Sequence, residues 1–585
     1  MRPIRLFPGL MLLAAAAFGA PAKAARPVAF VHANVVPMDA DRLLRDQTVV
    51  VEGGRIAAMG PSATTVAPKG AEIVDAKGRY LMPGLADMHV HVYAPQELTL
   101  YVVNGVTTVF DLDGRPVYLD WRGRIERGDL LGPTIYSAGP MFNRRRSAEE
   151  AVAEVDRQGA AGYDAVKIYN QVSAAEYGAL TAEAKKKNLV LVGHVAREPG
   201  FTATLAAGQS IAHAEEFVYT FFKDDAEPNE VVHPLDTLKI PQAVAMTREA
   251  GISVIPTLVA FHNIVRQATA LQAYLQDPHF KYHAPFLRAQ LEPAANTYAH
   301  RWEPESLPGL KLNYEFQRLL VAALHDGGVP ILAGTDASWL GVPGFSLIEE
   351  IENFQDIGFT PYAALRAATA DPAKLLRREN DFGTIAVGRR ADLVLLRDNP
   401  LTDARHLRGI AGVMTNGRWI PDAERRRLLE GVPGSYERML ARLTAQARTR
   451  LAAVDTELAA GDPMGALSSA VLTDLLARSD PRPVSRALAE LHRSNPGSHL
   501  TAEETLNQLG YDLYGREQKD AAIEIFRLNT ELYPASGNAY DSLAETYLRM
   551  GNEARAKELY AKALAVEPDY TNAKEARRIV EGKAN

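Results

Sequence analysis

The sequence predicts an α/β protein: a (β/α)8 TIM barrel with a small composite β-sandwich domain and a C-terminal α-helical repeat domain. Between residues 84 and 380, short β-branched runs alternate with helical stretches, which is the pattern of such a barrel. Strand-rich stretches flank this region on both sides, and the end of the chain repeats with a period of 34 residues. At 585 residues the chain is also too long for one ordinary domain.

The first 24 residues have the pattern of a secretory signal peptide, which is removed from the mature protein. Arg2 and Arg5 supply positive charge ahead of the apolar run Leu6–Ala20, and a small-x-small cleavage motif follows at 22–24. The alternative is a membrane anchor, but the run is shorter than the about 20 residues of a spanning helix and contains a Pro-Gly pair. We therefore expect a periplasmic or secreted protein with no membrane span after cleavage.

Residues 25–83 and 381–428 are expected to form the two parts of one β-sandwich domain. Apolar and polar residues alternate in Val28–Val36 and Thr48–Gly60, and a similar strand pattern returns in Ile410–Ile420. The two parts would meet in space although the barrel residues separate them in sequence.

The barrel domain, residues 84–380, should contain eight parallel strands, each followed by a helical stretch. Each predicted strand is a short run rich in β-branched and other apolar residues. The eight runs are Leu85–Val92, Val106–Asp111, Thr134–Ala138, Ala165–Tyr169, Val190–Val195, Ser210–Ala214, Ser253–Thr257 and Pro330–Thr335.

Residues 501–585 contain two copies of the 34-residue pattern. The positions Leu509, Gly510, Ala522, Phe526 and Pro534 recur as Leu543, Ala544, Ala556, Tyr560 and Pro568. They resemble a pair of tetratricopeptide repeats, helix hairpins that bury one face only against a neighbour. Because two repeats are marginal alone, we expect residues 429–500 to form a helical linker that caps them. A protein partner, packing onto the barrel and self-association all remain open as their role.

The composition excludes some classes of function. A formal net charge of -7 argues against a nucleic-acid-binding protein, which would carry a basic stripe. The chain has no cysteine, so disulfides do not contribute to its stability. Any metal ion must therefore be held by histidine, by carboxylate or by a modified side chain.

The sharpest motif is Asp87-Met88-His89-Val90-His91, in the first predicted barrel strand. Residues two apart on a strand point to the same side, so His89 and His91 can share one metal ion. Such a pair is weak evidence alone, because many are surface accidents.

Four more residues near the C-terminal ends of other predicted strands strengthen this hypothesis. They are Lys167, His194, His213 and Asp336. Barrel enzymes place their active sites at this end, and imidazole and carboxylate are ligands that zinc and similar divalent ions prefer. One such residue alone is explained as a hydrogen-bonded core residue or a strand end, but six on five strands of one barrel are not.

Lys167 tests the hypothesis, because two divalent cations would repel an ammonium group strongly. Reaction of its amine with carbon dioxide gives a carbamate, an anion whose two oxygens can bridge two metal ions. Together with Asp336 and a bridging hydroxide, it would balance three of four positive charges and leave one to polarise a carbonyl group. The alternative is a lysine that forms a salt bridge at the strand end.

These residues together resemble the amidohydrolase superfamily, and within it the imidazolonepropionase-like branch with a carboxylated lysine, which includes dipeptidases. The resemblance covers about Pro27–Pro421. It extends to segments without predicted ligands, namely Pro343–Leu347, Ala368–Ala373, Gly383–Ile385 and Ala391–Val394.

The resemblance implies a binuclear site, with zinc as the expected metal. One ion would be held by His89, His91 and Asp336. The other would be held by His194 and His213, and Lys167 would bridge the two ions as a carbamate. Asp336 and Lys167 would thus be both metal ligands and catalytic residues.

The resemblance also implies a mechanism for a small-molecule or short-peptide substrate. Hydroxide generated on the metals attacks the substrate carbonyl. Asp336 accepts the proton and later delivers it to the leaving nitrogen. The predicted reaction is hydrolysis of a small amide or peptide bond, in a dipeptide or an N-acyl amino acid.

The resemblance becomes weaker at the substrate pocket. Many relatives carry a Gly-Gly-His turn after the third strand, whereas here Ser137–Asn143 is followed by three arginines. Arg144 can bind a substrate carboxylate through its planar fork, or lie in a solvated loop. Tyr169 can hydrogen-bond substrate or pack within the barrel. His262 is a further candidate that can equally be an incidental loop residue.

Two other functions remain open at this point. The same metal site can hydrolyse a lactone, a carbamate or a phosphotriester, since one hydroxide serves all of these reactions. Alternatively, the protein is a non-catalytic scaffold that acts through its repeats, but such a protein would not need six intact metal ligands.

Overall fold

The computed structural model describes residues 26–143, 146–223, 235–293, 296–337, 340–447, 451, 452, 454, 455, 466–476, 480–568, 570 and 572–581. The predicted signal peptide and Arg144 lie outside these residues. Within them, no helix is both long enough and apolar enough to cross a membrane.

Seven of the eight predicted barrel strands form two parallel sheets. The first sheet contains β6 (Leu85–Val90), β7 (Val106–Asp111) and β8 (Thr134–Ser137). The second contains β9 (Ala165–Ile168), β10 (Val190–Gly193), β11 (Ser210–Ala212) and β12 (Val254–Ile255). Almost all residues of these strands are buried, as expected for parallel sheets that are covered on both faces.

The eighth predicted strand, Pro330–Thr335, is not a regular strand. An isolated bridge between Val254 and Ile331 joins it to β12, and another between Val90 and Ala337 joins β6 to the chain just after it. Two further isolated bridges, Ala138–Ala165 and Phe142–Ile168, join the edges of the two sheets. Because single bridges do not form a ladder, no closed barrel is present among the described residues. The result is an α/β fold with parallel sheets, consistent with a TIM barrel.

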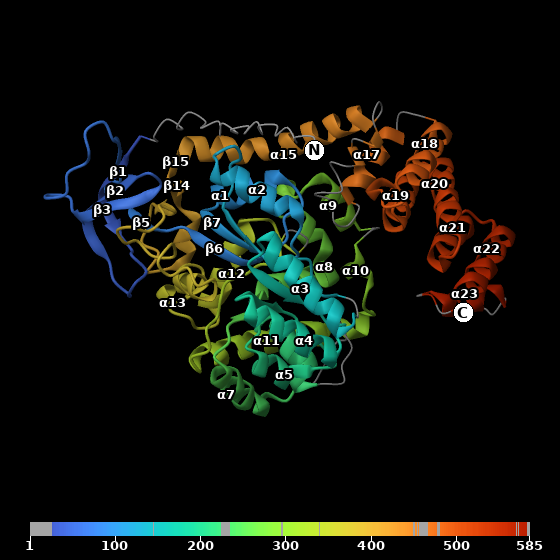
Figure 1. The fold of residues 1–585 in the computed structure, drawn as a ribbon, viewed down its shortest axis with the longest axis horizontal. Coiled ribbons are helices and arrows are strands. Elements are labelled where there is room, and N and C mark those ends of the chain that lie inside the picture. Colours follow the sequence, from blue (N-terminus) through green and yellow to red (C-terminus); the bar gives the residue numbers. More distant parts are fainter. Residues whose placement is uncertain are drawn as a thin grey trace, which may run out of the picture.

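Helices surround the parallel sheets (Figure 1). Sequence-encoded caps set their starts: Ser147 and Glu150 form a capping box ahead of α3, and Ser173 caps α4. The helices are α1 (Pro95–Val103), α2 (Pro116–Glu126), α3 (Ala148–Ala161), α4 (Ala174–Lys186), α5 (Gly200–Ala207), α6 (Glu215–Phe217), α7 (Ile240–Ala250), α8 (Leu258–Leu275), α9 (Pro285–Leu291), α10 (Thr297–His300), α11 (Leu307–Asp326), α12 (Phe345–Asp356), α13 (Pro361–Ala367) and α14 (Ala370–Leu375).

The two strand-rich stretches meet in one eight-stranded sheet, so the predicted composite β domain is built on a single sheet. Its order is β15-β14-β13-β5-β1-β2-β3, with β4 beside β1. The strands are β1 (Val28–Val35), β2 (Leu44–Glu52), β3 (Arg55–Pro61), β4 (Glu72–Asp75), β5 (Tyr80–Pro83), β13 (Leu393–Leu396), β14 (Ile410–Thr415) and β15 (Arg418–Pro421). Antiparallel pairing of β5 with β13 joins the two stretches, and Phe30 packs edge-on against Trp419 in the core.

The C-terminal region is helical. It contains α15 (Asp422–Ala447), α17 (Ala466–Leu476), α18 (Pro481–Ser494), α19 (Glu503–Gly515), α20 (Lys519–Leu532), α21 (Gly537–Arg549), α22 (Glu553–Val566) and α23 (Ala573–Val580). α15 begins directly after β15, within the residues predicted as the second part of the β domain, and its acidic first turn favours a helix start.

The helix starts follow the predicted period. Glu503 and Gly537, which open α19 and α21, are 34 residues apart, as are Lys519 and Glu553, which open α20 and α22. The helical region is thus compatible with the predicted repeats.

One hydrophobic core joins the C-terminal helices to the α/β domain. Leu100 of α1, Phe286 of α9, Tyr436 of α15 and Leu472 of α17 are buried in the same cluster. In Figure 1, α15 runs from the small sheet to the C-terminal helices. The helical region is therefore packed on the α/β domain through a continuous apolar core.

Candidate metal centre

The six predicted metal ligands come together at the C-terminal ends of the parallel strands. His89 lies within β6 and Lys167 lies within β9. His91, His194 and His213 directly follow β6, β10 and β11, and Asp336 directly follows the irregular segment 330–335.

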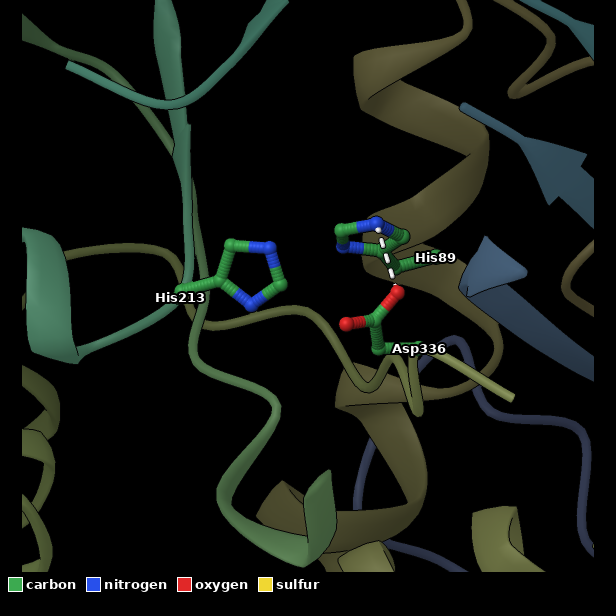
Figure 2. A group of neighbouring side chains, drawn as sticks. All are labelled: His89, His213 and Asp336. Carbon is green, nitrogen blue, oxygen red and sulfur yellow. Dashed lines mark ion pairs between the residues drawn. The ribbon is translucent and has the colours of Figure 1, made fainter. Parts of the chain in front are cut away.

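Asp336 contacts two of the histidines in this cluster. Its Oδ1 is 3.0 Å from His91 Nε2 and 3.3 Å from His89 Nε2. His89 Nε2 is in turn 3.4 Å from Lys167 Nζ. Figure 2 shows Asp336 and His89 joined by their ion pair, with His213 facing them from the opposite side.

Two further histidines extend the cluster. The ring centroid of His213 lies 4.7 Å from that of His89 and 4.6 Å from that of His194. Potential ligand atoms of His89, His213 and Asp336 all lie within 4.8 Å of one another. Imidazole nitrogens and a carboxylate at this spacing form a donor set suited to zinc and similar divalent ions.

Left-handed backbone conformations occur at three residues of this region. The φ angles are 73° at His213, 54° at Asp336 and 49° at Thr257. Such conformations cost on the order of 1–3 kcal/mol each and persist where the surrounding structure enforces them, often at functional sites. The β-branched Thr257 is the most unusual of the three.

Buried hydrogen bonds orient two of the histidines. His213 Nδ1 lies 2.8 Å from Thr257 Oγ1, and His194 Nδ1 lies 2.8 Å from Glu216 Oε1. When one ring nitrogen is engaged in this way, the other is left as the metal-binding atom.

Asp87 forms hydrogen bonds that stabilise the backbone next to His89 and Asp336. Its carboxylate accepts hydrogen bonds from the Thr335 hydroxyl at 2.7 Å, from the Thr335 N–H at 3.1 Å and from the His89 N–H at 3.3 Å. It therefore links the backbone that carries His89 to the backbone that carries Asp336.

Asp336 and His91 form the charged pair of the site. Burial opposes the charge of Asp336, but the hydrogen bond with His91 and the nearby positive charges lower its pKa to about 2. Burial also opposes the charge of His91, but the contact with Asp336 raises the pKa of its imidazole.

The other basic groups are shifted toward their neutral forms. Burial lowers the pKa of His213 to about 3 and also lowers the pKa values of His89 and His194. Burial lowers the pKa of Lys167 to about 8, although nearby carboxylates oppose the shift. Neutral imidazole is the form that binds a metal ion, so the donor set fits divalent cations.

The cluster opens into a cavity of about 460 Å³. One part of its wall is apolar and includes Phe261, Ile264 and Leu340. Polar side chains line the rest, including Asn143, Gln171, Glu215, Tyr298 and Gln317. Burial raises the pKa of Glu215 to about 8, and the charges of Glu216 and Asp336 add to this shift.

Comparison with known proteins identifies the family. Residues 80–420 match the sequence profile of the Amidohydrolase family. The chain belongs to this family. The amidohydrolase is 27% identical to an imidazolonepropionase of Streptomyces coelicolor over 384 residues, which cover 60% of this chain and 86% of that enzyme. It is also 26% identical to an adenine deaminase 2 of Agrobacterium fabrum over 413 residues, which cover 67% of this chain and 55% of that enzyme.

Solved structures agree with this assignment. A putative prolidase from Bifidobacterium longum has 25% sequence identity and a TM-score of 0.53, and the match covers 70% of the amidohydrolase and 100% of that chain. A Xaa-Pro dipeptidase with bound methionine in its active site shares the fold, with 20% identity and a TM-score of 0.54 over 68% of this chain and 100% of the other. The amidohydrolase is therefore a hydrolase that acts on carbon–nitrogen bonds.

The three predicted substrate-binding residues of the amidohydrolase have different positions relative to the cavity. Tyr169 lines the cavity, and its ring centroid lies 4.2 Å from that of His194. His262 is not among the residues that line the cavity. It stacks on Tyr314 at 5.2 Å, because its neighbour Phe261 takes the position on α8 that faces the cavity.

Arg144 lies outside the described residues, so its predicted role stays a prediction. The nearby Arg146 is held within the fold: its guanidinium lies 4.9 Å from the Phe142 ring and 3.9 Å from Glu176.

Sequence reasoning did not select Thr257 or Tyr298 in the amidohydrolase. Thr257 is a polar residue at the C-terminal end of a predicted strand, which is the same signal that identified the metal ligands. Tyr298 lies on the four-residue helix α10, far from any motif, and no sequence signal connects it to the cavity.

Proposed function

We propose that this amidohydrolase is an exported, binuclear metal-dependent enzyme that hydrolyses a small amide or peptide bond in a dipeptide or an N-acyl amino acid. The observation that carries the proposal is the convergence of six potential ligands from five separate segments at one cavity. A single cluster of this composition at the strand ends is the arrangement that barrel hydrolases use.

In this proposal, two zinc ions bind at the cluster. His89, His91 and Asp336 would hold one ion, and His194 and His213 would hold the other. When bound, the ions would lower the pKa of a coordinated water and polarise the substrate carbonyl.

Lys167 would join the two ions as a carbamate. Its amine is buried, and a pKa of about 8 leaves a larger uncharged fraction at neutral pH than an exposed lysine has. The uncharged amine is the form that reacts with carbon dioxide. Among the described residues its Nζ forms no ion pair with a carboxylate, which argues against the salt-bridge alternative.

Asp336 would move the proton. Its low pKa keeps the carboxylate ionised, so Oδ1 can accept a proton from the attacking water and later donate it to the leaving nitrogen. The hydrogen bonds of Thr257 with His213 and of Glu216 with His194 would hold these two histidines in the orientation that the metal ions need.

The test combines metal analysis with a substrate screen on protein purified without chelator. We expect at least one divalent ion per chain and hydrolysis of dipeptides or N-acyl amino acids. Lactones, carbamates, phosphotriesters and adenine are screened in parallel, the last because of the adenine deaminase relatives. Turnover of these compounds with no hydrolysis of any dipeptide or N-acyl amino acid contradicts the proposed substrate class. Less than one ion per chain without any turnover supports a non-catalytic scaffold.

Three structural predictions accompany this function. We propose that residues 1–24 direct export to the periplasm or beyond, that the parallel strands and the segment 330–335 close into a (β/α)8 barrel, and that residues 501–585 are tetratricopeptide repeats. The bridges at Ala138 and Ile331 support the barrel, and the 34-residue spacing of helix starts supports the repeats. Cell fractionation with the cleavage site mapped on the mature protein tests the export.

A further inference from the structure

The cavity above the proposed metal ligands has an uneven distribution of charge. Among the described residues that line it, Asp336 and Glu215 are carboxylates, and Lys167 is the only lysine or arginine. The proposed mechanism uses Asp336 and Lys167 but gives no role to Glu215.

Among the described residues, Glu215 has no hydrogen-bonding or ionic partner, unlike its neighbour Glu216. Glu216 is bound by His194 at 2.8 Å and by Arg197 at 3.0 Å. Glu215, the first residue of α6, forms no hydrogen bond or ion pair with the described part of the chain and lines the cavity. A partly buried carboxyl group without a partner is costly unless a ligand supplies one.

Two phenol rings line the same cavity as Glu215. They belong to Tyr169 and Tyr298, and the cavity that they share with Glu215 has a volume of about 460 Å³. A small ligand in this cavity can therefore meet the carboxyl group and the rings together. A carboxylate combined with aromatic rings is a favourable environment for an ammonium group.

Arg301 is the cation that competes for this position. Its guanidinium lies 5.0 Å from the Tyr298 ring and 5.7 Å from the Trp302 ring. It is exposed, does not line the cavity and forms no ion pair with Glu215. The carboxyl therefore remains available to a ligand in the cavity.

We propose that Glu215, together with Tyr169 and Tyr298, binds a protonated amine of the substrate. This inference deepens the proposed function and rests on it: it selects dipeptides with a free amino group over N-acyl amino acids. The apolar wall of Phe261, Ile264 and Leu340 would accept an aliphatic side chain of the same dipeptide.

The test compares two substrates that differ at one group. L-alanyl-L-leucine carries the ammonium group, and isobutyryl-L-leucine has a methyl group in its place. The zinc-loaded full chain should show a kcat/KM at least tenfold higher for alanyl-leucine. Glu215→Gln should lose most of this preference, because it keeps the shape of the side chain but cannot ionise to pair with the ammonium group.

Gln171→Ala is the matched control, since it changes the shape of the same cavity without changing its charge. We expect this variant to keep the preference for alanyl-leucine whatever its overall rate. Metal content and circular dichroism verify that both variants are folded and loaded. If Glu215→Gln does not fold, inhibition of the wild type by alanine and by isobutyrate provides the same comparison, with alanine expected to bind at least tenfold more tightly.

The outcomes separate this inference from the proposed function. Equal kcat/KM values of the wild type for the two substrates, an unchanged preference in Glu215→Gln, or equal inhibition by alanine and isobutyrate overturns the ammonium site and leaves amide hydrolysis standing. Absence of hydrolysis of every amide in the screen contradicts the proposed function and the ammonium site together.

Discussion

Lys167 is a fully buried amine whose Nζ lies 3.4 Å from an imidazole nitrogen and forms no ion pair with a carboxylate of the described residues. If it bridges two metal ions as a carbamate, Lys167→Ala should lose bound metal and roughly a thousandfold in kcat/KM, since the metals supply the nucleophile and the electrophile. Short carboxylic acids such as propionate should restore part of the activity by occupying the space of the carbamate. Metal analysis and amide hydrolysis measure both effects.

The control for this substitution is Lys185→Ala, which removes an exposed lysine from α4. It should retain metal and activity. Normal activity in Lys167→Ala would rule out the carbamate.

Thr257 affects the site through a single hydroxyl group. Thr257→Val keeps the β-branched shape in a strained backbone position but removes the hydrogen bond to His213 Nδ1. We expect metal affinity to fall by about 10- to 100-fold, the usual cost of losing a group that orients a metal-bound histidine. Thr257→Ser keeps the hydroxyl and should bind metal nearly as the wild type does, and competition with a chromogenic chelator measures the affinities. Equal affinities of the valine and serine variants would show that this hydrogen bond does not position His213.

At the scale of elements, the ends of β9 and β10 are packed so closely that a larger side chain at Gly193 would clash. At Gly193, the last residue of β10, φ is 141° and an added Cβ would lie 2.2 Å from the carbonyl oxygen of Ile168 in β9. Gly193→Ala should therefore cost about 1–3 kcal/mol of stability, as overpacking does, and should displace His194, the next residue. Chemical denaturation and metal content detect the two effects.

Gly178 is the matched control within a helix. It is exposed in the middle of α4, and an added Cβ would meet nothing within 4 Å. Gly178→Ala should stabilise the protein by up to about 1 kcal/mol and leave metal content unchanged, because alanine favours a helix more than glycine does. A Gly193→Ala variant as stable as the wild type would mean that β9 and β10 are farther apart than described.

At the scale of the whole molecule, the metal ions would cross-link segments from His89 to Asp336. Because ions that bind only the folded state stabilise it, zinc at about 100 times its Kd should add about 2.7 kcal/mol. We expect chelator dialysis to lower the Tm of the barrel by several degrees and zinc to restore it.

Calorimetry with and without chelator measures this effect. The shared apolar core of α1, α9, α15 and α17 predicts that the neighbouring C-terminal helices unfold with the barrel. An unchanged Tm after verified removal of all metal would contradict a metal site that links these strands.

The sequence predicted most of the fold because its signals are local. Seven parallel strands begin within one residue of their predicted starts, since alternation and β-branched runs depend on neighbours in the chain. The eighth run, Pro330–Thr335, forms no regular strand because its neighbours reach it only through isolated bridges. The start of α15 at Asp422 was not predicted, because this helix follows β15 without any intervening loop.

The sequence by itself determined the chemistry of the site: histidines, a lysine and an aspartate at strand ends, where parallel strands deliver them to one face. Only the tertiary structure decided which ring nitrogen is held by Thr257 or Glu216, and that Tyr298 and Glu215 line the cavity. The physical reason is distance along the chain. Thr257 is 44 residues from His213 and Thr335 is 248 residues from Asp87, so these contacts exist only once the strands have packed together.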